Sequence, residues 1–130
     1  MRTLEHEGEK ILHKELSYRI IEACIEVHNN LGPGFSEKIY ERALCKELNR
    51  CGIAFERQKV IPVYYKDDLI GEHRLDLLID GRVVLELKAV SELIPLFSAQ
   101  VFSYLKSTAL RLGILVNFGE KRLRFVRIVH

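Results

Sequence analysis

The chain has 130 residues and a mass of 15.1 kDa, which is enough for one domain with one hydrophobic core and too little for two. Its 48% hydrophobic and 29% charged residues exclude a disordered tail or a coiled coil. No apolar run reaches the roughly 18 residues of a membrane-spanning helix, and the charged first ten residues are unlike a signal peptide. We therefore expect a single cytoplasmic domain over residues 1–130, with no membrane partner and a loosely ordered segment at residues 1–13.

The formal net charge of +2 is unevenly distributed along the chain. Residues 93–130 contain six Lys and Arg but one acidic residue, so the last third is basic while the rest is slightly acidic. A basic section of this kind favours a polyanionic partner.

The three cysteines are Cys24, Cys45 and Cys51. They form no C-x-x-C pair, so one chain cannot build a zinc or iron–sulfur site from them without outside ligands. All three lie among apolar residues, and we expect buried free thiols, which fits a reducing cytoplasm.

Helical periodicity marks the first part of the chain. Apolar residues recur at three- and four-residue spacing from about residue 15 to residue 30, which predicts an amphipathic helix. Gly32-Pro33-Gly34 ends this pattern, because proline lacks the backbone N–H and glycine tolerates positive φ. Ser36 is a suitable N-cap for a second helix that ends at Gly52. Its predicted buried face consists of Ile39, Ala43, Leu44 and Leu48.

The remainder of the chain alternates mostly between strands and turns. Strands are predicted over residues 55–65, 70–79, 82–88, 112–117 and 123–129. Pro95 is expected to open a helix that continues to about Thr108. The resulting order, ααβββαββ, indicates an α/β (α+β) fold with a mixed sheet, in which a crossover helix delivers the fourth strand in parallel.

The turn between the second and third strands decides where two carboxylates point. A two-residue turn centred on Asp80-Gly81 would place Asp76 and Glu86 on opposite faces of the sheet. A three-residue loop over residues 79–81 would pair Leu78 with Arg82 and bring the two carboxylates together. Because this second register also aligns the apolar side chains of both strands on the other face, we predict the bulged turn.

In the predicted register, Lys88 joins Asp76 and Glu86 on one face of a sheet whose other face is core. Carboxylates are the hard oxygen ligands that Mg²⁺ prefers, and a lysine can stabilise charge on a phosphate or an attacking hydroxide. The alternative interpretation is a set of solvent-exposed charges on a half-buried hairpin.

These residues resemble those of a known family. Asp76 followed by Glu86-Leu87-Lys88 resembles the D…(D/E)xK signature of the PD-(D/E)XK nuclease superfamily, although Leu75 replaces the proline of that signature. The resemblance spans residues 14–129 and implies a restriction-endonuclease-like αβββαβ core with an extra N-terminal helix and a C-terminal strand. Residues 34–40 resemble the G-x-x-E-x-x-Y motif of the GxxExxY family. Gln100 and Tyr104 resemble the Q-x-x-x-Y element of RecB-like members.

The resemblance implies a metal-dependent nuclease that acts on nucleic acid, with DNA favoured over RNA. Its cofactor would be Mg²⁺ or Mn²⁺, bound by Asp76, Glu86 and the backbone carbonyl of Leu87. The implied catalytic residues are Glu37, Asp76, Glu86, Lys88, Gln100 and Tyr104. The alternatives from the residues alone are a helix N-terminal stabiliser for Glu37 and plain helix surface for Gln100 and Tyr104.

Further residues are candidates for accessory and binding roles. His28, Tyr40 and Gln58 are possible accessory residues, although packing in the core or on the surface explains each equally well. The candidate nucleic-acid contacts are basic, namely Arg74, Lys106, Arg111, Lys121, Arg122 and Arg124. A solvated basic edge strand is the alternative for the last hairpin.

Two other functions stay open at this point. One is a non-catalytic nucleic-acid- or protein-binding module that keeps the nuclease fold. The other is a small structural subunit that needs a partner to complete a substrate channel. Since so short a chain has few insertions with which to grip DNA, we also expect a homodimer or a partner protein.

Overall fold

The computed structural model describes residues 11–130. Its elements are α1 (Lys14–Leu31), α2 (Glu37–Arg50), β1 (Phe55–Tyr65), β2 (Asp68–Ile79), β3 (Val83–Lys88), α3 (Pro95–Thr108), β4 (Leu112–Asn117) and β5 (Arg124–Val129). Residues 1–10 of the segment expected to be loosely ordered lie outside this range, and a turn at residues 12 and 13 leads into α1. No helix in the described range is long and apolar enough to cross a membrane.

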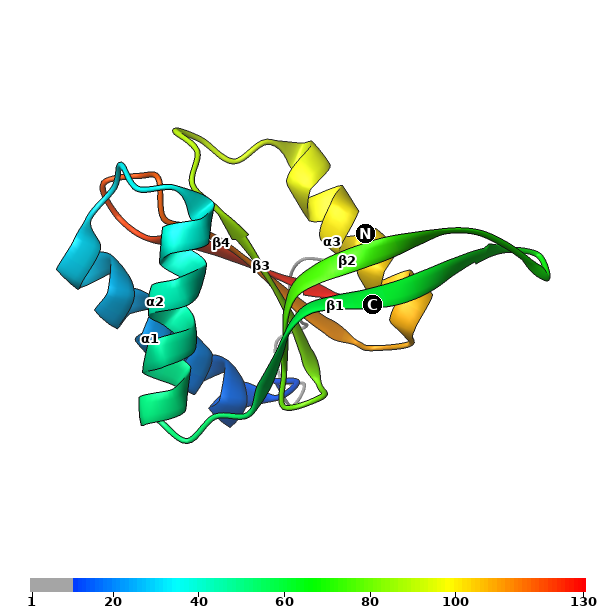
Figure 1. Ribbon diagram of the computed structural model, residues 1–130, viewed down its shortest axis with the longest axis horizontal. Helices are drawn as coiled ribbons and strands as arrows, with labels where there is room; N and C mark the ends of the chain where they lie inside the picture. The colour runs from blue at the N-terminus through cyan, green and yellow to red at the C-terminus, as the bar shows by residue number, and fades with distance from the viewer. Residues whose placement is uncertain (1–10) are drawn as a thin grey trace.

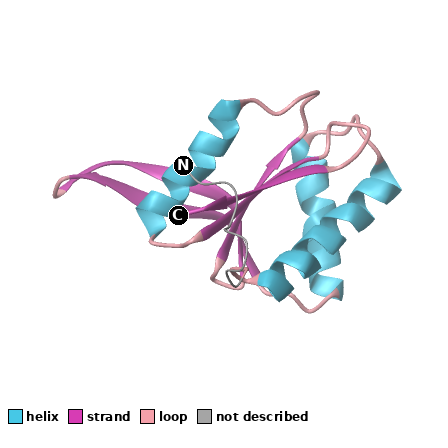
Figure 2. Ribbon diagram, turned by 180° about the vertical axis from the view of Figure 1, so that it is seen from behind, coloured by secondary structure: helices cyan, strands magenta, loops and turns pink. Residues whose placement is uncertain are grey.

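The strands form one mixed sheet in the order β1-β2-β3-β4-β5. Strands β3 and β4 are parallel, and every other neighbouring pair is antiparallel. Helix α3 makes the crossover between the two parallel strands, while α1 and α2 lie together away from it (Figure 1). The view from behind shows the same separation of the helices (Figure 2). The predicted α/β mixed-sheet fold is therefore confirmed.

The hydrophobic core has two parts, one on each face of the sheet. On one face, α1 and α2 pack against side chains such as Leu85 and Ile114. On the other face, Val101 of α3 packs against Val84 and Leu115. The prediction that only one face is core therefore needs correction, because α3 also covers the face that carries the carboxylates.

The β2–β3 register differs from the predicted one by two residues. Leu78 pairs with Val84 rather than with Arg82, and residues 80–82 form the connection. Asp80 and Gly81 both have positive φ, at 52° and 65°, and the Arg82 N–H donates to the carbonyl of Ile79 at 2.9 Å. Because the shift is an even number of residues, the side chains of Leu77 to Ile79 and of β3 stay on their predicted faces. Leu75, which was expected on the same apolar face as Leu77, lies instead on the α3 face.

Two burial predictions were wrong. Ile39 is 44% exposed, and Tyr40 takes the buried position beside Leu44 in α2. Cys51 is exposed because it caps the end of this helix, whereas Cys24 and Cys45 are buried free thiols. The predicted N-cap is confirmed, since the Ser36 hydroxyl accepts the N–H of Ile39 at 3.4 Å.

Candidate active site

The candidate site begins at Asp76, where the regular pairing of β2 stops. On one side, the ladder with β3 covers only Leu77 to Ile79. On the other side, the opposing residue of β1 is Gln58, whose φ of 50° interrupts the strand. The Asp76 carboxylate uses this gap, because its Oδ2 accepts the backbone N–H of Leu87 at 2.9 Å. The interruption of the sheet therefore fixes the orientation of a carboxylate.

Glu86 is the most constrained acidic group in the site. Its side chain is buried, and its Oε1 has no hydrogen-bond partner among the described residues. The pKa of Glu86 is raised to about 8, mainly by burial and then by the Asp76 charge, with Lys88 opposing the rise. Burial also raises the pKa of Asp76, against the effect of the Leu87 N–H. A buried carboxylate beside a half-buried one, both resisting ionisation, favours the binding of a proton or a cation.

Glu37 approaches the same carboxylates from α2. It lies in the first turn of the helix, and partial burial raises its pKa. Lys88 lowers this pKa and Asp76 raises it, so both groups lie within electrostatic reach of Glu37. The structure therefore brings Glu37, Asp76, Glu86 and Lys88 to one region.

Tyr40 holds the loop that positions Glu37. Its hydroxyl donates to the carbonyl of Gly32 and accepts the N–H of Phe35 at 3.2 Å. Its buried ring stacks on Phe118 with the ring centroids 4.7 Å apart. Tyr40 is thus a core aromatic that fastens the turn between α1 and α2.

Glu41 is a buried site residue that the sequence analysis missed. It lies one turn after Glu37 on α2 and accepts two hydrogen bonds from Arg57, at 3.0 and 2.8 Å, on its Oε2. The Gln58 amide donates to its Oε1 at 2.8 Å. The four-residue spacing from Glu37, which puts both carboxylates on one helix face, was the signal available in the sequence.

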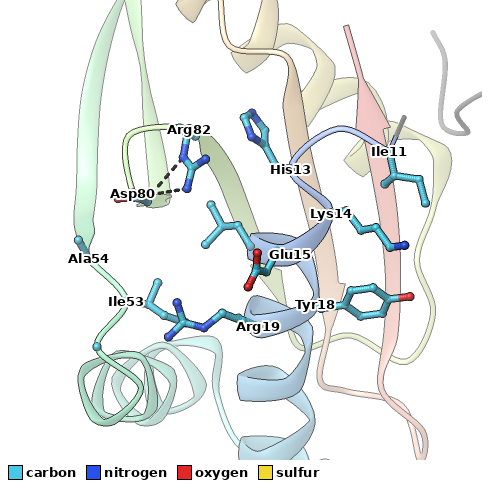
Figure 3. Close-up of a pocket in the computed structure, with 12 residues that line it drawn as sticks. Ile11, His13, Lys14, Glu15, Tyr18, Arg19, Ile53, Ala54, Asp80 and Arg82 are labelled. Atoms are coloured by element: carbon cyan, nitrogen blue, oxygen red, sulfur yellow. Dashed lines mark hydrogen bonds and ion pairs between the residues drawn. The ribbon is translucent and has the colours of Figure 1, made fainter. Parts of the chain in front are cut away.

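These groups line an open cavity of about 450 Å³. Its walls are formed by Glu37, Lys38, Glu41, Arg57, Gln58, Asp76 and Leu87. A larger cavity of about 890 Å³ lies at the start of α1 and the β2–β3 turn, where Arg82 pairs with Asp80 (Figure 3). None of the predicted site residues lines this second cavity.

Lys88 lies at the end of β3 with its ammonium over an aromatic ring. The Nζ atom is 4.4 Å from the ring centroid of Phe97, and it forms no ion pair within 4.0 Å among the described residues. A cation over a ring face is attracted by the ring quadrupole. Phe97 therefore holds the lysine close to the carboxylates without neutralising it.

The two predicted residues of α3 are placed differently. The pKa of Tyr104 is raised to about 12, mainly by burial and then by the charges of Glu86 and Asp76, so the phenol lies near both carboxylates. Its ring also contacts His73 at a centroid distance of 4.7 Å. Gln100 is half-buried one turn earlier, and the described structure records no hydrogen bond of its side chain to the carboxylates.

His28 is a packing histidine, one of the two interpretations that the sequence left open. It is buried at the end of α1 and donates through Nε2 to the Glu120 carbonyl at 2.9 Å. Its ring also lies beside Phe118. The hydrogen bond of His28 thus ties α1 to the loop after β4 and does not involve Glu37.

The candidate nucleic-acid contacts are all exposed but do not form one surface. Lys121, Arg122 and Arg124 lie at the same end of the sheet as Lys88. This follows because Asn117 at the end of β4 pairs with Lys88 on one side and with Arg124 on the other. Arg111 precedes the opposite end of β4, and Lys106 lies in the last turn of α3 before it. Arg74 lies two residues before Asp76 on β2.

A divalent cation fits the carboxylate pair. Within residues 11–130, no group of three or more His, Cys, Asp or Glu side chains is arranged to hold a metal ion. However, Glu86 leaves a buried oxygen unpaired beside Asp76, and both groups are hard oxygen ligands. Mg²⁺ usually keeps several waters and needs only one or two carboxylates, so this pair suffices.

Comparison with known proteins agrees with the fold. Residues 14–128 match a family model described as the PD-(D/E)XK nuclease superfamily. Searches of curated proteins and of solved structures gave no match. The matched span runs from the start of α1 into the last strand and includes all the acidic groups described above. The chain therefore belongs to the PD-(D/E)XK nuclease superfamily.

Proposed function

We propose that this protein is a divalent-metal-dependent nuclease that hydrolyses phosphodiester bonds in DNA. The observation that supports this best is the buried, unpaired Glu86 oxygen beside Asp76, with the Lys88 ammonium nearby. Membership of a nuclease superfamily supports the same class of reaction. An acidic pair with one buried, unpaired carboxylate and a lysine nearby has no comparable explanation as a stabilising feature, because buried unpaired charge is costly.

In the proposed mechanism, Asp76, Glu86 and the Leu87 carbonyl would hold Mg²⁺ or Mn²⁺. Such an ion supplies Lewis-acid stabilisation and lowers the pKa of water to produce a nucleophile. Lys88 contributes a fixed positive charge next to the phosphate, where negative charge develops during the reaction. Tyr104 keeps its proton, since its pKa is about 12, and can donate a hydrogen bond to a phosphate oxygen.

Glu37 completes the acidic site from the side of α2. Partial burial raises its pKa, and it lines the open cavity, so its carboxyl group can hydrogen-bond a water that enters there. We assign it to orienting that water, with Gln100 as an outer member on α3. The exposed residues Lys121, Arg122 and Arg124 are the proposed phosphate contacts at this end of the sheet.

We further propose that the chain is a GxxExxY protein, because each residue of that motif has a physical role here. Gly34 has a φ of 114°, which residues with a side chain rarely adopt. Glu37 lines the cavity, and Tyr40 fastens the loop through its hydroxyl. The three residues together set the position of the acidic group supplied by α2.

A cleavage assay tests this proposal. Supercoiled plasmid and linear duplex or single-stranded DNA would be incubated with the full chain in Mg²⁺, in Mn²⁺ or in EDTA. We expect cleavage that needs the metal and that is lost in Lys88→Ala and Glu86→Gln. Lys46→Ala, which removes an exposed lysine of α2, is the matched control and should cleave normally. DNA binding without cleavage in either metal would contradict the nuclease and support the non-catalytic binding module.

A further inference from the structure

The hairpin of β1 and β2 extends beyond the rest of the molecule. Both views show its end free of the helices (Figures 1 and 2). We call residues 59–74 the arm; they lie between the kink at Gln58 and the buried Leu75. The inner face of the arm packs towards α3, since Ile61 is buried in the α3 cluster and His73 contacts Tyr104.

The outer face of the arm is exposed and carries an apolar row, with Arg74 and Glu72 opposite Val60 and Pro62 near the base. Strand alternation places Val60, Pro62 and Tyr64 opposite the inner-facing Ile61, and Leu69 is the cross-strand partner of Tyr64. Tyr64 and Leu69 are 59% and 65% exposed, and Ile70 at the adjacent bulge is 63% exposed. A two-stranded ribbon alone is marginally stable in water, and contiguous exposed apolar patches mark interaction sites.

The charges of the arm show which partner it suits. Three basic and three acidic residues cancel. The tip, with Lys66, Asp67 and Asp68, has a net charge of −1, while the base, with Lys59, Glu72 and Arg74, has a net charge of +1. An arm without net positive charge does not suit a polyanion such as DNA. Tip and base are about 20 Å apart, for six residues at 3.3 Å each. Two arms packed antiparallel would therefore place the acidic tip of each beside the basic base of the other.

We propose that two copies of this chain form a two-fold dimer in which their arms pack antiparallel through the outer faces. The exposed Val60, Tyr64, Leu69 and Ile70 supply on the order of 400 Å² of surface per copy. The charged residues at the tip and base of the arm add to this buried area and bring it towards the roughly 800 Å² per partner of a standard interface. Asp76 follows the arm on the same strand, so each acidic site would lie near the tip of the partner's arm.

The oligomeric state tests this dimer independently of any nuclease activity. Light scattering coupled to size exclusion should give the mass of a dimer for the wild type, and a monomer for Tyr64→Ser/Leu69→Ser with an unchanged circular dichroism spectrum. Leu96→Ser is the matched control, because Leu96 is equally exposed at 59% but lies on α3. A monomeric wild type, or a dimer that survives the double substitution in the folded protein, would overturn the proposal.

Charge reversal tests the antiparallel arrangement. Asp67→Lys/Asp68→Lys reverses the tip, and Lys59→Glu/Arg74→Glu reverses the base. Each variant alone should dimerise at least about tenfold more weakly at low salt, because like charges then face each other. A mixture of the two variants should form a heterodimer, since every tip again meets a base of opposite charge. Failure of the mixture to associate, with both variants folded, would exclude this packing.

Discussion

Replacing Glu86 with glutamine is expected to stabilise the metal-free protein at alkaline pH. Burial raises the pKa of Glu86 from its ordinary value of 4.5 to about 8. Between these values the folded protein keeps a proton that the unfolded chain has released, so the free energy of unfolding falls as the pH rises. At 1.4 kcal/mol for each pKa unit, the loss is on the order of 4 to 5 kcal/mol by about pH 8. Glutamine removes this cost because it stays neutral.

Urea-induced unfolding in EDTA at several values between about pH 5 and about pH 8 measures this effect. The free energy of unfolding of the wild type should fall by several kcal/mol across this pH range, and that of Glu86→Gln should fall much less. The fall that remains in Glu86→Gln would come from Asp76, whose pKa is also raised. Glu92→Gln, an exposed control, should follow the wild type. Mn²⁺ at 100 times its Kd should raise the free energy of unfolding by about 2.7 kcal/mol in the wild type but not in Glu86→Gln. Parallel pH profiles for the wild type and Glu86→Gln would refute the reasoning.

Three other substitutions test the support of the site. Phe97→Leu should slow single-turnover cleavage about tenfold, because Lys88 loses its contact with the aromatic ring. Phe97→Tyr keeps a ring and should cleave at nearly the normal rate. Equal rates for the two variants would contradict a role for this contact. Tyr40→Phe should lower the free energy of unfolding in urea by about 1 to 2 kcal/mol, and an unchanged value would argue against the loop hydrogen bonds. Gly34→Ala should cost about 1 to 3 kcal/mol through its φ of 114° alone. Gly71→Ala, with equal space and no positive φ, should cost less than Gly34→Ala in the same unfolding measurement.

Much of the fold could be predicted because its elements have strong local signals. Pro95 marks the start of α3, and Ser36 caps α2, as the sequence indicated. The apolar rows of β2 and β3 required one common face, which kept Asp76 and Glu86 together even though the register was wrong. Side-chain parity in a strand survives any even shift, so this inference needed a three-residue turn but not its exact position.

Other features depend on tertiary contacts that leave no local pattern. The left-handed conformation of Asp80 set the register, and nothing in the apolar alternation encodes it. Glu41 becomes part of the site only because the kink at Gln58 and the side chain of Arg57 reach it from β1. Tyr40 replaced Ile39 in the core because its hydroxyl finds partners in the preceding loop.

The central claim is that Asp76 and Glu86 share a divalent cation, and anomalous diffraction from a crystal soaked in Mn²⁺ tests it most directly. The account predicts an anomalous peak bound by both carboxylates and the Leu87 carbonyl, which is absent from crystals of Glu86→Gln. A wild-type crystal without a peak at this pair, or a peak that persists unchanged in Glu86→Gln, would contradict it.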